Sequence, residues 1–158
     1  MDRMSEMAPD NQNQPYALLT IEQHMLLLPQ REVCTLESVL NIRTGNPPDD
    51  GVGWLSFGHH DWPVYGMDTA LNPLSAVPAN QRICALLTLE EGYFGLLCSN
   101  ASTAQSSAVA CRPLPRAMAK PLTPIRALVW FGDRVGLVST AIALAAYLSV
   151  PVEALITT

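Results

Sequence analysis

Four pairs of short apolar segments, each joined by a few turn-forming residues, recur along the chain. Such pairs are typical of β-hairpins, because β-prone runs flank residues that favour tight turns. The runs are about five residues long, which suits small barrels better than a wide sandwich. The predicted pairs are Tyr16–Ile21 with His24–Leu28, Gly53–Phe57 with Trp62–Tyr65, Arg82–Leu89 with Tyr93–Cys98, and Ile125–Phe131 with Arg134–Val138.

Proline content argues against a bundle of long helices. The chain has 13 prolines among 158 residues, and each removes a backbone donor and blocks a helix interior. Hydrophobic residues make up 49% of the chain and charged residues 15%, so it is neither a disordered nor a fibrous protein. The sequence therefore predicts a mainly β fold whose antiparallel sheets curl to bury both faces of their strands.

One short helix is predicted near the C-terminus, at Thr140–Leu148. Ser139 and Thr140 suit an N-cap, and Pro151 is expected to end the helix. The uncharged stretch 135–152 approaches the length of a membrane span, but a helix of about ten residues is too short to cross a bilayer.

The segments between the hairpins are predicted from their turn residues and prolines. Because Pro63 lacks a ladder donor, its strand is expected at a sheet edge or bulge. Residues 1–15 form a polar leader expected to be disordered. The other expectations are a short helix or irregular strand at Arg31–Ser38, an extended run at Val39–Arg43, a loop at Thr44–Gly53, a helical turn at Gly66–Leu71, a loop at Asn72–Gln81, a polar linker at Ser99–Ser107 and irregular chain at Val109–Thr123.

Motifs of catalysis and metal binding are not found in the sequence. There is no Gly-rich phosphate loop, no G-x-S-x-G and no H-E-x-x-H. The four cysteines form no C-x-x-C pair, which favours reduced thiols in a cytoplasmic protein over a zinc site. His59 and His60 beside Asp61 could hold a metal, but the spacing supplies no further ligand. We expect no catalytic residue, no metal and no cofactor.

One polar and aromatic constellation surrounds the second hairpin turn. It is either a solvated turn with its tryptophans packed in the core, or a partner-binding face, since exposed Trp and Tyr anchor protein interfaces. The candidate partner-binding residues are Trp54, His59, His60, Trp62 and Tyr65.

Charge excludes one class of partner and leaves another open. A net charge of −5 argues against a broad nucleic-acid surface, which needs clustered cations. Arg112, Arg116 and Arg126 lie in a mildly basic stretch. The alternative function is therefore a small anionic-ligand-binding β-barrel protein that uses these three arginines.

The segment Gly53–Met67, GWLSFGHHDWPVYGM, resembles the CheW-like domain, the adaptor module of bacterial chemosensory arrays. Other family features occur in the expected order over residues 16–148. Tyr16–Pro29 looks like the opening hairpin, Arg82–Cys98 is similar to the paired strands with an apolar-Gly-apolar-apolar stretch, and Pro124–Leu148 resembles the closing hairpin and terminal helix.

The resemblance implies two small five-stranded SH3-like barrels around a shared core. Residues 16–158 would then form a single CheW-like domain of two intertwined lobes. It also implies no enzymatic activity. Family members bridge a chemoreceptor and a histidine kinase through barrel ends and an apolar groove between the lobes.

Three departures from the family pattern imply a divergent member. The family's Asn-x-Arg-Gly turn is Ser56–His59 here, so the turn arginine associated with receptor coupling is absent. Gly66 stands where an acid is usual, and Cys98-Ser99 replaces the usual Val-Asp. These departures favour a pilus-linked or other non-flagellar array over standard chemotaxis coupling.

Overall fold

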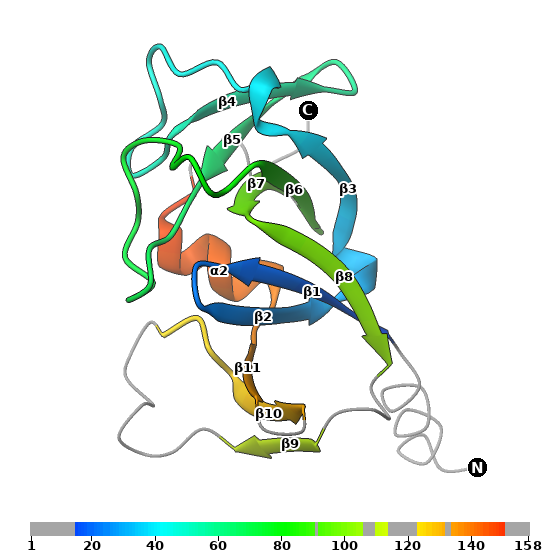
Figure 1. Cartoon of the computed structure of the whole chain (residues 1–158). Coiled ribbons are helices and arrows are strands. Elements are labelled where there is room, and N and C mark those ends of the chain that lie inside the picture. The colour runs from blue at the N-terminus through cyan, green and yellow to red at the C-terminus, as the bar shows by residue number, and fades with distance from the viewer. Residues whose placement is uncertain (1–14, 91, 106–109, 114–122, 132–133, 151–158) are drawn as a thin grey trace, which may run out of the picture.

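The computed structural model describes residues 15–90, 92–105, 110–113, 123–131 and 134–150, and the strands among them form two curled sheets (Figure 1). One sheet has six strands in the order β8-β1-β2-β11-β10-β9, and the other has five in the order β3-β6-β7-β5-β4. The strands are β1 (Pro15–Ile21), β2 (His24–Pro29), β3 (Val33–Ser38), β4 (Gly53–Phe57), β5 (His60–Tyr65), β6 (Ile83–Leu89), β7 (Gly92–Cys98), β8 (Asn100–Gln105), β9 (Ala110–Pro113), β10 (Ala127–Phe131) and β11 (Arg134–Val138).

The predicted mainly β fold of two curled sheets with a short helix is confirmed, and the four-residue β9 makes one sheet six-stranded. All four predicted hairpins are present as β1–β2, β4–β5, β6–β7 and β10–β11. The chain leaves the six-stranded sheet after β2 and returns to it at β8. In each sheet one parallel pair, β2–β11 or β5–β7, joins two hairpins.

The central strands bury both faces, which explains their nearly continuous apolar sequences. In β6, Ala85 and Leu87 face a core shared by both sheets, whereas Cys84 and Leu86 face an inner core of the five-stranded sheet. The shared core consists of Leu19, Ile21, Leu26, Leu28, Tyr65, Met67, Ala85, Leu87, Phe94, Leu96, Cys98, Ile125, Ala141, Leu144, Ala145, Leu148 and Val150. The inner core consists of Val52, Leu55, Trp62, Val64, Cys84, Leu86 and Leu97.

Helix α2 (Ala141–Leu148) confirms the helix predicted at Thr140–Leu148 and lies between the sheets (Figure 1). The Thr140 side chain caps it by accepting a hydrogen bond from the Ala143 amide at 3.2 Å. The Ala141 amide donates to a Glu32 carboxylate oxygen at 2.7 Å. Ser149, in the left-handed conformation, ends the helix. No helix in the described part of the chain is long and apolar enough to cross a membrane.

The predicted linker Ser99–Ser107 is wrong, because β8 (Asn100–Gln105) occupies most of it. Asn and Ala are depleted in strands and only Thr103 favours one, so the local sequence gives little strand signal. The strand is fixed by pairing along β1, from Pro15↔Gln105 to Thr20↔Asn100. The Ser99 amide adds a bond to the Thr20 carbonyl at 2.8 Å. Tertiary pairing therefore decides the structure here.

Two other local predictions, at Val39–Arg43 and Gly66–Leu71, are wrong because polar side chains hydrogen-bond to the local backbone and set its conformation. Val39–Arg43 is not extended throughout, because the Ser38 hydroxyl accepts from the Leu40 amide and starts the 3₁₀ helix η2 (Val39–Asn41). Gly66–Leu71 is not a helical turn. Its Asp68 carboxylate accepts from the amides of Ala70 and Asn72, each at 2.9 Å, and shapes a loop instead.

Three remaining segments differ in how far the structure describes them. The predicted leader 1–15 lies outside the described residues except for Pro15, which begins β1. Arg31–Ser38 continues the 3₁₀ helix η1 (Gln30–Glu32) into β3, which has a bulge between Val33 and Thr35. Within 109–123, residues 110–113 form β9 and 114–122 lie outside the described part.

Pro63 does not lie in an edge strand, because β5 runs between β4 and β7. The parallel pairing with β7 starts only at Val64, one residue after the proline. Pro63 itself is opposite Trp54 of β4. Its missing donor is therefore tolerated in the part of β5 that has a single neighbour.

Candidate partner-binding site

The β4–β5 hairpin closes with a two-residue turn, Gly58-His59, and both residues have positive φ, at 61° and 67°. This combination is that of a type I′ turn, whose twist matches paired strands. The predicted turn of four residues is thus too long, because His60 and Asp61 belong to β5. Since side chains alternate along a strand, these two residues point to opposite faces of the hairpin.

The structure corrects the predicted partner-binding patch for Trp62 and Tyr65, whose side chains are buried. Trp62 lies in the inner core, where its Nε1 donates to the Phe57 carbonyl at 3.0 Å and its ring lies 4.6 Å from that of Tyr93. Tyr65 lies in the shared core, and burial, Asp50 and Asp49 all raise its pKa. The Tyr65 hydroxyl has no hydrogen-bond partner among the described residues. Neither side chain can contact a partner without opening a core.

Trp54, His59 and the ion pair beside them form an exposed surface that we call the hairpin face. Trp54 is half-buried and donates from Nε1 to the Asn46 carbonyl at 2.7 Å. Arg43 forms an ion pair with Asp61 at 2.7 Å, and the Ser56 hydroxyl donates to the same carboxylate at 2.8 Å. Both charged groups are exposed, so the pair adds little stability and mainly orders this surface.

Arg43 belongs to this surface and is not among the residues predicted for it. It lies 18 residues before Asp61, and the intervening loop, β4 and hairpin turn carry no signal of the contact. Two backbone hydrogen bonds with Trp54, at 2.7 and 2.9 Å, place Arg43 along the edge of β4. The turn Gly58-His59 contains no arginine, but the guanidinium of Arg43 lies beside the same hairpin.

The two histidines and Asp61 do not converge on a point. His59 is exposed in the turn, and His60 is half-buried with its ring 5.5 Å from that of Tyr93. Asp61 lies on the opposite face, paired with Arg43. Across the described ranges, no three His, Cys, Asp or Glu side chains gather in a group that could hold a metal ion.

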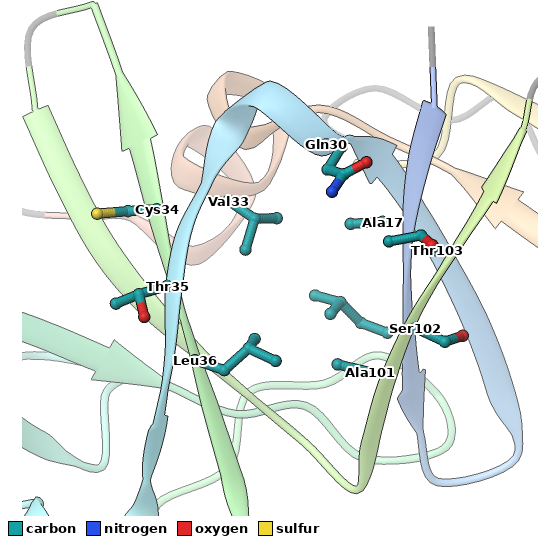
Figure 2. A pocket seen from close by; sticks show the side chains of 10 residues that line it. Ala17, Gln30, Val33, Cys34, Thr35, Leu36, Ala101, Ser102 and Thr103 are labelled. Atoms are coloured by element: carbon teal, nitrogen blue, oxygen red, sulfur yellow. The ribbon is translucent and has the colours of Figure 1, made fainter.

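A groove of about 250 Å³ lies between β3 of one sheet and β1–β8 of the other. We call it the intersheet groove. In Figure 2 the side chains of Val33 and Leu36 point from β3 toward Ala17, Ala101 and Thr103 on the opposite wall. None of its lining residues is charged, so the groove suits an apolar, uncharged segment. The lining is Ala17, Leu19, Gln30, Val33, Cys34, Thr35, Leu36, Ala101, Ser102 and Thr103.

A second cavity, of about 530 Å³, lies near the start of α2 and carries both signs of charge. It is lined by Arg31, Glu32, Thr88, Leu89, Glu90 and Ile142. Glu32 is already engaged by the helix amide of Ala141, so this cavity does not offer a free carboxylate there.

The three arginines of the alternative function are not gathered by the described structure. Arg126 is exposed and lines neither cavity described above. The backbone of Arg112 lies in β9 opposite Leu128, and Arg116 lies outside the described residues. An anion site at these residues stays a prediction.

The described cysteines differ in environment, which gives a first testable prediction. Cys34 is exposed in the groove wall, whereas burial raises the pKa of both Cys84 and Cys98 to about 12 from a usual 9.0. At pH 8 their thiolate fraction is then about a thousandfold lower than that of an ordinary thiol. In a Cys111→Ser variant, a thiol reagent should modify Cys34 rapidly and spare Cys84 and Cys98. Mass spectrometry of the digest identifies the modified residues, and fast labelling of Cys84 in the folded chain would contradict the burial.

The chain has a CheW-like fold, as comparison with solved structures shows. It superposes on the crystal structure of the scaffolding protein TtCheW from Thermoanaerobacter tengcongensis with a TM-score of 0.64 and 10% sequence identity, covering 80% of this chain and 88% of that one. No family model matches the sequence. No curated protein sequence matches it significantly either. The predicted resemblance is therefore confirmed for the fold.

Proposed function

We propose that this chain, with its CheW-like fold, is a non-catalytic adaptor that docks a histidine kinase regulatory domain, a chemoreceptor, or both. The observation that carries the proposal is the superposition on a scaffolding protein over 80% of the chain. An adaptor contributes binding free energy and geometry, and it needs no reacting groups. We place it in a chemosensory array in the bacterial cytoplasm. The absence of the family's turn arginine at Ser56–His59 favours a pilus-linked or other non-flagellar array.

An adaptor that bridges two proteins needs two separate docking surfaces. The hairpin face belongs to β4 and β5, and the intersheet groove belongs to β1, β3 and β8. Trp54 and His59 supply aromatic contacts on the first surface, with His60 at its border and the Arg43–Asp61 pair as a polar rim. The groove supplies an uncharged second surface. We assign one partner to each.

The test is affinity purification of the tagged chain from its source organism, followed by mass spectrometry. A kinase or chemoreceptor of a chemosensory system should be recovered. Because interface tryptophans are often dominant contacts, Trp54→Ala should weaken recovery of one partner about tenfold or more, and His59→Ala should weaken it less.

The matched control is Ile142→Ala, which truncates an apolar side chain that is 60% exposed on α2 and belongs to neither surface. It should leave partner recovery unchanged. Melting curves must show that each variant folds. Recovery of neither a kinase nor a receptor by the wild-type chain would refute the proposal.

A further inference from the structure

The connection between β5 and β6, residues 66–81, leaves the five-stranded sheet and reaches β2 and α2, and we call it the strap. It contains no helix or strand, and connections of this length without either are uncommon and usually functional. In Figure 1 it runs from β5 past α2 before it returns to β6. Its own hydrogen bonds shape it, from the Leu74 amide to the Gly66 carbonyl at 2.8 Å and from the Leu71 amide to the Asp68 carbonyl at 2.9 Å.

The strap contributes apolar side chains to both cores. Met67 is fully buried in the shared core, and Leu71 packs against the same core. Further along the strap, Leu74 and Val77 pack against the inner core. Opening of the strap would therefore uncover apolar surface of both cores, and exposure of Met67 would report it.

Two side chains from outside the five-stranded sheet hold the strap through its backbone carbonyls. The Tyr147 hydroxyl of α2 donates to the Leu71 carbonyl at 2.7 Å. A ring nitrogen of His24, the first residue of β2, donates to the Thr69 carbonyl. These two bonds tie the strap to the helix and to the six-stranded sheet.

Gln81 ties the end of the strap to the β1–β2 turn. Its side-chain amide donates to the Glu22 carboxylate at 2.8 Å and to the Met67 carbonyl at 3.2 Å. The residue is fully buried, yet its Oε1 has no hydrogen-bond partner among the described residues. A buried acceptor without a partner carries a desolvation cost, so this tie also works against the closed arrangement.

The backbone of the strap opposes closure as well. Leu71 has a φ of 67°, in the left-handed region that residues other than glycine and asparagine rarely adopt. Between Thr69 and Asn80 the strap is mostly exposed. Exposed backbone hydrogen bonds and a strained residue are typical of segments that open locally while the rest of a protein stays folded.

We propose that the strap is a conformational switch, which opens as one unit and releases Met67 and Leu71 from the shared core while both sheets stay folded. Tyr147, His24 and Gln81 hold it closed. Because β5 carries part of the hairpin face and runs directly into the strap, a partner that binds this face with different affinity in the two states would shift their equilibrium. That consequence rests on the proposed function, whereas the opening itself does not.

Thiol labelling of a Met67→Cys variant of the folded chain tests the opening. Cys34 and Cys111 are replaced by serine, so that the new thiol is compared with Cys98, which is equally buried in the same core but lies in β7. The Met67→Cys thiol should react at least tenfold faster than Cys98, because β7 becomes exposed only on global unfolding. Mass spectrometry of the digest gives both rates.

A matched thiol tests whether shortening a core side chain is enough to cause labelling. Leu28→Cys removes bulk from the same core within β2, and its thiol should react as slowly as Cys98. If Met67→Cys does not fold, amide hydrogen exchange in the wild-type chain replaces it. The Leu71 and Leu74 amides should then exchange at least tenfold faster than the Leu86 amide at the centre of β6.

One further substitution weakens the closed strap. Tyr147→Phe removes the bond to the Leu71 carbonyl and should raise Met67→Cys labelling about three- to tenfold. Tyr93→Phe is the matched control, because the ring of Tyr93 contacts His60 and Trp62 of β5, and it should leave this labelling unchanged. If Tyr147→Phe does not fold, His24→Ala replaces it.

A substitution in the other sheet separates strap opening from global unfolding. Val129 is fully buried in β10, so Val129→Ala should destabilise the whole fold and raise the labelling of Cys98. It should not raise the labelling of Met67→Cys, since β10 stays folded when the strap opens.

Equal labelling of Met67→Cys and Cys98 would overturn the inference, because the strap would then open only when the sheets unfold. Equal acceleration of both thiols by Val129→Ala, or no effect of Tyr147→Phe, would overturn it too. The labelling is independent of the pull-down above. Fast labelling of Met67→Cys without recovery of a kinase or receptor would refute the proposed function alone. Recovery of such a partner with equal labelling rates would refute the switch alone.

Discussion

Replacing Phe94 by alanine is expected to lower the free energy of unfolding by about 3–5 kcal/mol. Phe94 is fully buried in the shared core, with its ring edge-on to that of Tyr65 at 6.1 Å. The substitution would open a cavity in the shared core, to which both sheets and α2 contribute side chains. Because the two sheets bury each other there, both should lose stability together and unfold in one transition.

Urea denaturation with two sets of single-tryptophan variants measures this effect. Trp62 reports on the five-stranded sheet and Trp130 on the six-stranded sheet. Their unfolding midpoints should coincide in the wild-type background and shift together on Phe94→Ala. The control, Ile142→Ala, should change stability by no more than about 0.5 kcal/mol. Separate midpoints for the two tryptophans would show that the sheets are independent domains.

Elements with strong local patterns were predicted well from the sequence, and elements fixed by distant pairing were not. The β6–β7 hairpin is expected directly from apolar runs on either side of a Glu-Glu-Gly turn. β8 has no comparable pattern, because Asn100–Gln105 consists of small and polar residues held by β1, some 80 positions away.

In the candidate site, too, features with a local sequence pattern are predictable and features that depend on distant packing are not. The hairpin turn and its aromatic residues were located from the sequence, but exposure was not, because Trp62 and Tyr65 alternate onto buried faces of a curled sheet. The intersheet groove has no sequence signal of its own. It is built from β1, β3 and β8, which meet only after the two sheets have packed. Because the sequence of β8 gives no strand signal, the groove cannot be predicted from the sequence either.

Substitution of Gly95 tests the packing at the centre of the five-stranded sheet. Gly95 of β7 lies opposite Leu86 of β6 and Val64 of β5. A Cβ at this position would lie 2.6 Å from the Cys84 sulfur and 3.3 Å from side-chain carbons of both register partners. The strand therefore has a glycine here because the inner core leaves no room for a side chain.

Gly95→Ala should accordingly destabilise the chain by about 2–3 kcal/mol through overpacking, despite the smaller entropy of the unfolded alanine chain. Gly45→Ala is the matched control, since a Cβ there meets no atom within 4 Å, and it should be neutral or slightly stabilising. Denaturation of Gly95→Ala in a Cys84→Ala background then isolates the cause. Removing the sulfur relieves the closest contact, so the cost of Gly95→Ala should fall below about 1 kcal/mol in that background. An equal cost in both backgrounds would mean that the clash with Cys84 is not the reason for the glycine.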